Sequence, residues 1–231
     1  MSATGPGRAD SLYRDLRELI VSGQIAPGSR LTEVGVADRM GVSRTPVRSA
    51  FQRLRQEGFL VRDGGSGRSP ATVAPLTRDD ARELFLIIGQ IEGLAAFFAA
   101  EQDEESRGRL VERLESCNAR LAEEAATKSP DFESLRTADS EFHRTYVDAG
   151  AGPRLHDLHD ALKPQSERYV RVYVRTLTAE MDVSVREHAE IIEAIREGSP
   201  PDAESRVKTN WRNAASRLGA VIEDRGELGS W

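Results

Sequence analysis

Hydrophobic and polar positions divide the chain into two stretches with different patterns. In the N-terminal third, segments with helical spacing precede two short apolar runs, whereas every later apolar pattern repeats at intervals of three and four residues. The first helical segment carries Leu12, Leu16, Leu19 and Ile20 on one face, and Asp10 or Ser11 is placed to cap it. The pattern therefore predicts a mixed N-terminal domain followed by an all-helical one.

A short helix, a glycine turn and a second helix are predicted between residues 31 and 60. Thr32 is placed to cap the shorter helix, and its expected buried side consists of Val34, Val36, Ala37 and Met40. Gly41 permits a sharp turn at positive φ, and Ser43 is placed to cap the next helix. This layout is that of a helix-turn-helix.

Two short apolar runs after this second helix predict a pair of strands, at 59–61 and 71–73. The glycine-rich residues 63–68 between them predict a flexible hairpin tip. Three helices and such a hairpin make a winged helix-turn-helix, which we place at residues 10–75, behind a disordered arm at 1–9.

Residues 76–231 show only helical patterns, so an all-α bundle is expected there. Six helices are predicted, at about residues 77–102, 104–126, 130–149, 154–174, 183–197 and 202–224. The first is the most apolar, and its expected buried residues are Leu84, Ile87, Ile88, Ile91, Leu94, Ala95 and Phe98. The predicted fold class is therefore mainly α, with a winged helix-turn-helix followed by a helical bundle.

Composition fits a soluble globular protein, with 39% hydrophobic and 30% charged residues. The single cysteine, Cys117, excludes an internal disulfide, which is typical of a reducing compartment. We found no apolar run of transmembrane length and no signal-peptide core, so a cytoplasmic protein without a membrane partner is expected.

The net charge of −6 is unevenly distributed. Residues 1–75 hold 11 Lys and Arg against 7 Asp and Glu, whereas the remainder holds 21 against 31. A basic domain on an acidic body suggests that the N-terminal domain meets a polyanion.

These segments resemble a known family. The runs GSRLTE at 28–33 and GVSRTPVR at 41–48, with Leu54 and Glu57-Gly58, closely resemble the GntR transcription regulators. The helical part resembles the FadR-type ligand-binding domain, called FCD, at 91–96, at Asp139 with 142–144, and at 187–195. The resemblance implies a homodimeric repressor that binds a palindromic operator in double-stranded DNA and responds to a small-molecule effector; it does not imply an enzyme.

The resemblance also assigns DNA contacts. Arg44, Thr45 and Arg48 lie at positions that read base edges, where arginine pairs well with guanine. Phosphate contacts are expected from Arg30, Arg39, Ser43 and Arg53, and a wing contact in the minor groove from Arg68. Ser49 stands where family members commonly carry an acidic residue, which bears on half-site preference.

Asp139 and His143 are four residues apart, so they share a helix face and could grip one cation. The resemblance adds His188 and a fourth ligand position, which Asn210 occupies, or Asn213 if the alignment shifts. Carboxylate and imidazole ligands suit zinc, nickel or manganese. The alternative is a polar cavity without metal.

In the family, the metal helps to hold a small organic acid, a carboxylate. Ile88 stands where many members carry an arginine, so other donors are required. Candidate effector contacts on the fourth helix of the bundle are Arg168, Arg171 and Tyr173.

Two other functions remain open from the residues alone. His156-Asp157 and His159-Asp160 could belong to an all-α metal-dependent hydrolase, although such an enzyme needs further ligands in a set order. An architectural DNA-binding protein without an effector is the other alternative.

Overall fold

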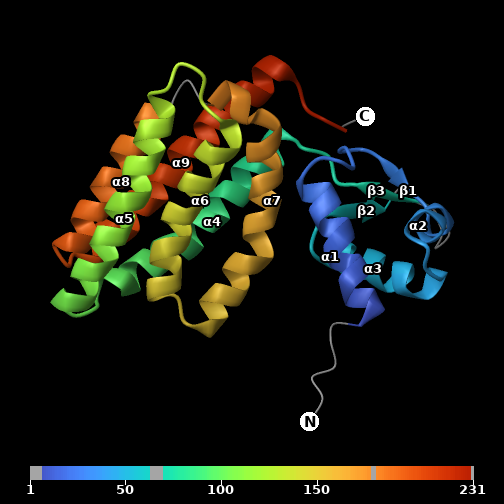
Figure 1. Ribbon diagram of the computed structural model, residues 1–231, viewed down its shortest axis with the longest axis horizontal. Coiled ribbons are helices and arrows are strands. Elements are labelled where there is room, and N and C mark those ends of the chain that lie inside the picture. Colours follow the sequence, from blue (N-terminus) through green and yellow to red (C-terminus); the bar gives the residue numbers. More distant parts are fainter. Residues whose placement is uncertain (1–6, 63–69, 178–180, 230–231) are drawn as a thin grey trace, which may run out of the picture. The chain divides into compact units, whose positions relative to one another are not determined.

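A computed structural model describes residues 7–62, 70–177 and 181–229. These residues form two compact units: the first runs to Thr77 and includes the stretch from Gly226 onward, and the second runs from Arg78 to Arg225 (Figure 1). The sequence pattern gave no sign that the end of the chain belongs with the first unit.

Three helices and a small antiparallel sheet make up the first unit. The helices are α1 (Arg8–Val21), α2 (Glu33–Met40) and α3 (Arg44–Gln56), and the strands are β1 (Arg30–Leu31), β2 (Leu60–Arg62) and β3 (Ala71–Val73). The strand order is β1-β3-β2, so that Thr72 of β3 lies opposite Arg30 on one side and Val61 on the other. The predicted winged helix-turn-helix is confirmed. Strand β1 was not predicted, because two residues are too few to show an alternating pattern.

The ends of the helices explain the sharp turn between α2 and α3. The Thr32 hydroxyl accepts a hydrogen bond from the backbone N–H of Gly35 at 3.0 Å, as a helix cap does. Gly41 ends α2 at φ 64°, a left-handed conformation that glycine adopts without steric cost.

Two local predictions in this unit were wrong. Helix α1 begins earlier than predicted, with Gly7 as its N-cap, so neither Asp10 nor Ser11 caps it. Val34, expected to be buried, is 50% exposed, because it falls on the solvent side of the short helix α2.

The core of this unit is continuous. Side chains from all three helices and from the sheet are buried together, among them Leu16, Ile20, Val47, Phe51, Leu54 and Phe59. Burying each such side chain stabilises the fold by about 1.5–3 kcal/mol.

The end of the chain completes this unit. Leu228 and Leu76 exchange backbone hydrogen bonds of 2.8 and 3.1 Å. Gly28 and Gly229 approach so closely that a Cβ atom on Gly28 would lie 2.7 Å from the Gly229 Cα, and both have positive φ. Both positions therefore require glycine.

The second unit is a helical bundle, as predicted. Its helices are α4 (Arg78–Ala100), α5 (Glu104–Ala125), α6 (Phe132–Gly150), α7 (Pro153–Leu177), α8 (Met181–Arg196) and α9 (Pro200–Arg225). Helix α4 is central and packs against α6, α7, α8 and α9 (Figure 1). Pro164 lies inside α7, which continues past it.

No apolar run of transmembrane length was found in the sequence, but helix α4 is long and apolar enough to cross a membrane by those two criteria alone. However, 56% of its most apolar stretch is buried inside the unit, as in the core helix of a soluble protein. The prediction for its buried face was only partly right: Leu84, Ile88 and Ala95 are buried, but three residues are 39–42% exposed, namely Ile87, Leu94 and Phe98. The apolar residues of α4 extend beyond the faces that α6, α7, α8 and α9 cover, so the stripe with Ile87, Leu94 and Phe98 stays exposed.

Candidate functional site

The first candidate site is the exposed face of α3. Val47, Ala50 and Leu54 pack inward, which leaves Arg44 and Arg48 exposed on the opposite side. Thr45 is exposed beside them, and so are Ser43, the N-cap residue, and Arg39 at the end of α2. The structure thus brings five of the predicted DNA-contacting residues to one end of the helix-turn-helix.

Glu33, in the first turn of α2, joins this face although the sequence did not single it out. Its carboxylate accepts two hydrogen bonds from Arg48, from Nε and Nη2, both at 3.2 Å. It also accepts a hydrogen bond from Arg44 Nη2 at 3.5 Å. The hydrogen bonds from Arg48, together with Arg44, lower the Glu33 pKa, so this carboxylate is ionised at neutral pH.

Arg53 lies apart from the other predicted contacts. It is nine residues beyond Arg44, or about two and a half helical turns, and therefore faces the opposite side of α3. Its guanidinium stacks 3.7 Å above the Tyr13 ring and pairs with Asp10 at 3.4 Å and Glu57 at 3.2 Å. Arg53 thus links α3 to α1.

One further predicted DNA contact lies in the sheet. Arg30 is exposed on β1. Arg68, expected at the wing tip, lies outside the described residues.

The second candidate site lies inside the helical bundle. Asp139 and His143 on α6 and His188 on α8 each offer one ligand atom, and these atoms lie within 4.8 Å of one another. The two histidines are buried, and Asp139 is half-buried. The structure therefore brings together the three residues predicted to hold a metal.

Hydrogen bonds fix the proton on His188. Asn118 Nδ2 donates to the Val185 carbonyl oxygen at 3.0 Å, which leaves Asn118 Oδ1 as the acceptor for His188 Nδ1 at 3.2 Å. The imidazole proton is therefore on Nδ1, and Nε2 carries a lone pair. Burial lowers the His188 pKa well below its usual value, which keeps the ring neutral.

That lone pair is available to a ligand. His188 Nε2 is buried, has no hydrogen-bond partner among the described residues, and lies 3.6 Å from Asp139 Oδ1. A neutral imidazole nitrogen facing a carboxylate is a suitable donor set for a divalent cation.

His143 is held in the same way by Glu92 of α4. His143 Nδ1 donates to Glu92 Oε2 at 2.7 Å, so its Nε2 atom is also left for a ligand. A carboxylate that fixes the far nitrogen of a histidine is typical of metal sites.

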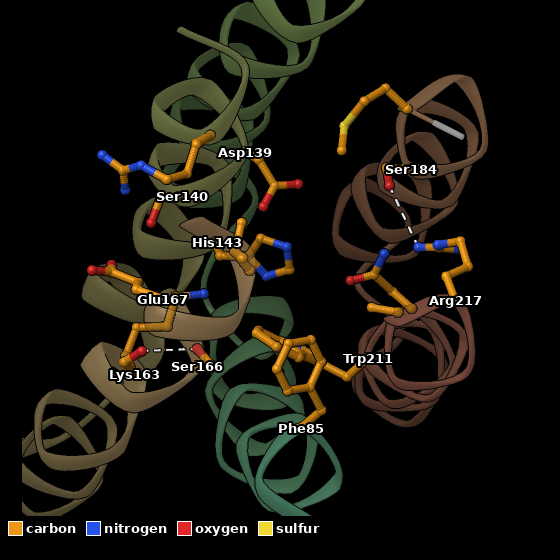
Figure 2. A pocket seen from close by; sticks show the side chains of 15 residues that line it. Phe85, Asp139, Ser140, His143, Lys163, Ser166, Glu167, Ser184, Trp211 and Arg217 are labelled. Carbon is orange, nitrogen blue, oxygen red and sulfur yellow. Dashed lines mark hydrogen bonds between the residues drawn. The ribbon is translucent and has the colours of Figure 1, made fainter. Parts of the chain in front are cut away.

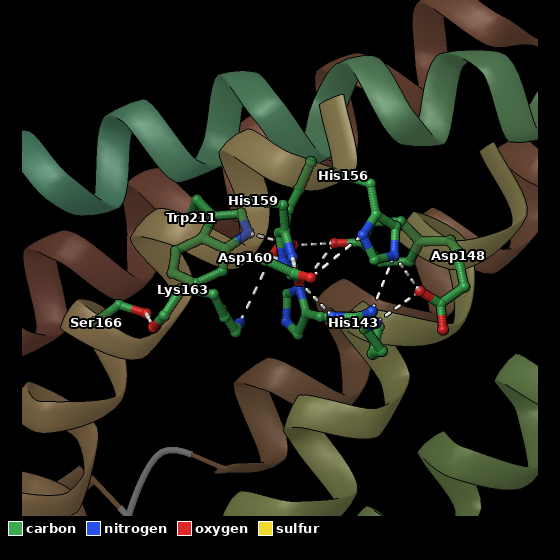
Figure 3. A network of polar contacts seen from close by, with 11 residues as sticks. His143, Asp148, His156, His159, Asp160, Lys163, Ser166 and Trp211 are labelled. Atoms are coloured by element: carbon green, nitrogen blue, oxygen red, sulfur yellow. Dashed lines mark hydrogen bonds and ion pairs between the residues drawn. The ribbon is translucent and has the colours of Figure 1, made fainter. Parts of the chain in front are cut away.

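Glu92 is the centre of a buried network and is itself 0% exposed. Its partners His143 of α6, His159 and Lys163 of α7 and Trp211 of α9 are labelled in Figure 3. Oε2 accepts hydrogen bonds from His143, Tyr146 at 2.5 Å and Trp211 at 2.8 Å, and Oε1 lies 3.0 Å from His159 Nε2 and 3.5 Å from Lys163 Nζ. Burial opposes ionisation, but Lys163 and the histidines outweigh it and hold the Glu92 pKa well below its ordinary value.

A cavity of about 90 Å³ adjoins this cluster. Figure 2 shows Asp139 and His143 projecting from α6 into the space opposite Ser184, Trp211 and Arg217. Three cations line it, Arg136, Lys163 and Arg217, and each is paired with a carboxylate outside the lining, Glu133, Glu92 and Glu187 respectively. Two further carboxylates, Asp139 and Glu167, line the cavity, so a bound divalent cation would offset their charge and leave N–H donors of the three cations for an anion.

Asn210 lines the cavity and is buried. Its amide Nδ2 donates to Glu187 Oε2 at 2.8 Å, so that Oδ1 is the remaining ligand atom. Asn213, the alternative fourth ligand, donates to Glu187 Oε1 at 2.7 Å and is not among the cavity-lining residues in the described part of the chain. The geometry favours Asn210 over Asn213.

The residues predicted to contact an effector lie elsewhere on α7. The cavity is lined from this helix by Lys163, Ser166, Glu167 and Val170, which share one face at intervals of three and four. Arg168 and Tyr173 are buried on other faces, and Arg171 Nη2 lies 3.9 Å from Glu133 Oε1. None of these three is among the described residues that line the cavity.

Sequence reasoning missed Glu92, Lys163 and Arg217 as site residues. Glu92 carried a signal, because it interrupts the apolar run of α4 and a buried carboxylate requires partners. Lys163 and Arg217 showed no such signal in the sequence, because charged residues on amphipathic helices are ordinarily exposed.

The two His-Asp pairs do not form a second centre. His159 points inward to Glu92, whereas His156 lies near the surface between Asp148 at 3.0 Å and Asp160 at 3.3 Å (Figure 3).

Comparisons with known proteins agree with this arrangement. Residues 8–68 match the family described as "Bacterial regulatory proteins, gntR family", and residues 83–213 match the FCD domain. The chain is 26% identical over 216 residues to the uncharacterised HTH-type transcriptional regulator YdhC of Bacillus subtilis (strain 168), covering 93% of this chain and 92% of the relative. It is 29% identical over 220 residues to the HTH-type transcriptional repressor RspR of Escherichia coli (strain K12), covering 95% and 91%.

Solved structures show a similar fold. A structure from Rhodococcus sp. RHA1, described as a GntR transcriptional regulator, superposes with a TM-score of 0.68 at 22% identity, covering 92% of this chain and 98% of that one.

Proposed function

This chain belongs to the GntR family of bacterial transcription regulators and carries an FCD domain, and from that premise we propose that it is a homodimeric repressor released from operator DNA by a small organic acid. It is a regulator and not an enzyme. Similarity to the Escherichia coli transcriptional repressor RspR supports repression.

DNA reading is assigned to the exposed end of α3. Arg44, Thr45 and Arg48 reach base edges in the major groove, and Arg39 and Ser43 contact phosphates. The support is that all five side chains are exposed on one end of the helix-turn-helix. Arg53 is less suited to this role, since it faces α1.

The homodimer is assigned to α4. Ile87, Leu94 and Phe98 are exposed, and half-buried Ile91 lies between them at helical spacing, so an apolar stripe follows one face of the helix. Such a stripe suits a two-fold axis, because each copy offers the other the same apolar surface.

Light scattering tests this assignment. The wild type is expected at twice the chain mass of 25.4 kDa, and Leu94→Glu is expected at the single mass. Arg82→Glu changes an exposed residue on another face of α4 and is expected to remain dimeric. Dimeric Leu94→Glu would refute the α4 interface.

A divalent metal is assigned to Asp139, His143 and His188, with Asn210 as a fourth ligand through Oδ1. Two nitrogen and two oxygen ligands fit zinc, nickel or manganese. When bound, the metal would supply positive charge and a coordination position for an effector carboxylate. This part of the proposal rests on the buried Nε2 of His188, which faces Asp139 and has no hydrogen-bond partner in the described part of the chain.

The effector is assigned to the adjoining cavity. Many family members carry an arginine where this chain has Ile88, so we assign the effector carboxylate to Lys163 and Arg217 instead. Arg136 contributes a further cationic side chain to the cavity wall. Lys163 Nζ also lies 4.5 Å above the Trp211 ring, which keeps the ammonium beside the cavity.

A thermal-shift screen tests the ligand assignments on the full chain. Small carboxylates and sugar acids are added with and without zinc, nickel or manganese. We expect stabilisation by one acid class that depends on metal and is lost in both His188→Gln and Lys163→Gln. Glu83→Gln, an exposed residue of α4, serves as the control. Stabilisation that survives in His188→Gln would refute the metal, and no stabilisation by any acid would refute the effector.

A further inference from the structure

Glu33 joins two elements of the DNA-reading face. It lies in the first turn of α2, and both of its partners, Arg44 and Arg48, lie in the first turns of α3. Its side chain is 27% exposed, whereas theirs are 61% and 65% exposed. The carboxylate is therefore the more enclosed partner, and the two guanidinium groups extend from it toward solvent.

The contact with Arg48 fixes the orientation of the guanidinium plane. Nε and Nη2 of Arg48 both donate to Glu33, and this two-bond geometry leaves little rotation. A guanidinium has five N–H donors, so three remain, on Nη1 and Nη2. The free edge between those two nitrogens has the spacing that pairs with O6 and N7 of guanine.

The same carboxylate also reduces the positive charge of this face. Glu33 is an anion beside two cations, so it weakens attraction to the phosphate backbone, which sets non-specific affinity. A residue that only neutralised charge would weaken binding to every sequence equally. An anion that also orients Arg48 would weaken non-specific binding through its charge, and would strengthen specific binding because it holds Arg48 in place.

We propose that Glu33 is a positioning residue for base recognition: it holds Arg48, and with it Arg44, in the orientation that reads the operator. The inference rests on the DNA-reading role proposed above for these two arginines. It concerns the ratio of specific to non-specific affinity, and not affinity alone.

The experiment compares two variants with the same change in charge. Glu33→Gln removes the anion that holds the arginines. Asp38→Asn removes an exposed anion of the same helix for which the structure shows no contact with Arg44 or Arg48. Both are made in the full chain, and circular dichroism and thermal unfolding confirm equal folded fractions.

The DNA probes come from the wild type itself. Wild-type protein selects duplexes from random-sequence DNA, and the selected duplex and a scrambled duplex of the same composition are then titrated by fluorescence anisotropy. A second selection with Glu33→Gln reports base preference position by position.

Glu33→Gln is expected to lower the ratio of specific to non-specific affinity by about tenfold, the order of magnitude of one well-oriented arginine–guanine pair. Asp38→Asn is expected to leave the ratio within about twofold, while both variants bind the scrambled duplex at least as tightly as the wild type. The double variant Glu33→Gln, Arg48→Ala is expected to have nearly the same affinity ratio as Arg48→Ala, because only the longer contact with Arg44, at 3.5 Å, is left for the second change to remove.

Three outcomes decide the matter. If Glu33→Gln changes the ratio no more than Asp38→Asn does, Glu33 is not a positioning residue. If it tightens both duplexes equally, Glu33 acts only by neutralising charge, which also overturns the inference. If the wild type selects no sequence at all, the DNA-reading role fails first, and the two failures are therefore distinguishable.

Discussion

Replacing Glu92 by glutamine tests how the bundle is held together around its cavity. The carboxylate is fully buried and interacts with five donor groups from α6, α7 and α9: His143, Tyr146, His159, Lys163 and Trp211. Glutamine has nearly the same volume, so the change removes the charge and one acceptor oxygen while leaving the packing in place.

Contacts that survive the Glu92→Gln substitution limit the expected loss in the free energy of unfolding. The remaining amide oxygen can serve the three donors at Oε2. His159 can adapt by moving its proton to Nδ1, which lies 3.5 Å from Asp160 Oδ1. Lys163 then loses its buried partner, and breaking a buried ion pair costs about 3–5 kcal/mol. Since Lys163 retains the Trp211 ring, we expect the lower end, about 3 kcal/mol, or a decrease of roughly 6–12 °C in Tm for a unit of this size.

Chemical denaturation followed by tryptophan fluorescence measures this loss. The chain has two tryptophans, so a Trp231→Phe background leaves Trp211, which contacts Glu92, as the reporter of the bundle. Glu83→Gln makes the same chemical change at an exposed position of α4 and is expected to lie within about 0.5 kcal/mol of the background.

A loss of less than about 1 kcal/mol in Glu92→Gln would contradict the reasoning, because neutral hydrogen bonds alone would then account for the network.

Three further perturbations have defined outcomes. Gly28→Ala is expected to destabilise the first unit by about 1–3 kcal/mol and more than Gly23→Ala, because both have positive φ but only Gly28 meets another backbone, at Gly229; urea unfolding measures the difference. Burial and the hydrogen bond to Glu57 raise the Tyr13 pKa to about 12. The native state therefore keeps a proton that the unfolded state releases, so stability present below about pH 10 is lost between about pH 10 and 12, and Tyr13→Phe is expected to remove that loss in alkaline unfolding. EDTA is expected to lower the Tm of metal-loaded protein by roughly 5–10 °C, the effect of removing a ligand at about 100 times its Kd, and to leave His188→Gln unchanged in a thermal scan.

The periodicity of apolar residues was sufficient to locate the helices, because each long helix has its own apolar face. All six helices of the bundle lie where a helix was predicted, and the helix-turn-helix follows from Thr32, Gly41 and the apolar residues of α3. Periodicity does not say what covers a face, which is why Ile87, Leu94 and Phe98 were wrongly expected to be buried in the single chain.

The candidate metal ligands could be proposed from spacing and resemblance, but their surroundings could not. That His188 donates through Nδ1 depends on Asn118, 70 residues away, and that His143 is fixed depends on Glu92, 51 residues away. The effector contacts predicted on α7 missed the cavity because the sequence shows that a helix is amphipathic without showing which neighbour each face meets.

Glu33 illustrates the same limit. It was visible only as an acidic residue in the first turn of a helix, where it complements the helix dipole. Its contacts with Arg44 and Arg48 arise from the turn at Gly41, which brings the start of α2 beside the start of α3.

The central claim is that a ligand in the helical unit controls the DNA-binding unit, and thermodynamic linkage tests it most directly. The affinity for the selected duplex is measured with and without the acid identified by thermal shift, and the affinity for that acid is measured with and without the duplex. Binding free energies require the two ratios to be equal. The account predicts that the acid weakens operator binding at least tenfold, with the same factor in reverse. An acid that binds the bundle and leaves operator affinity unchanged would contradict it.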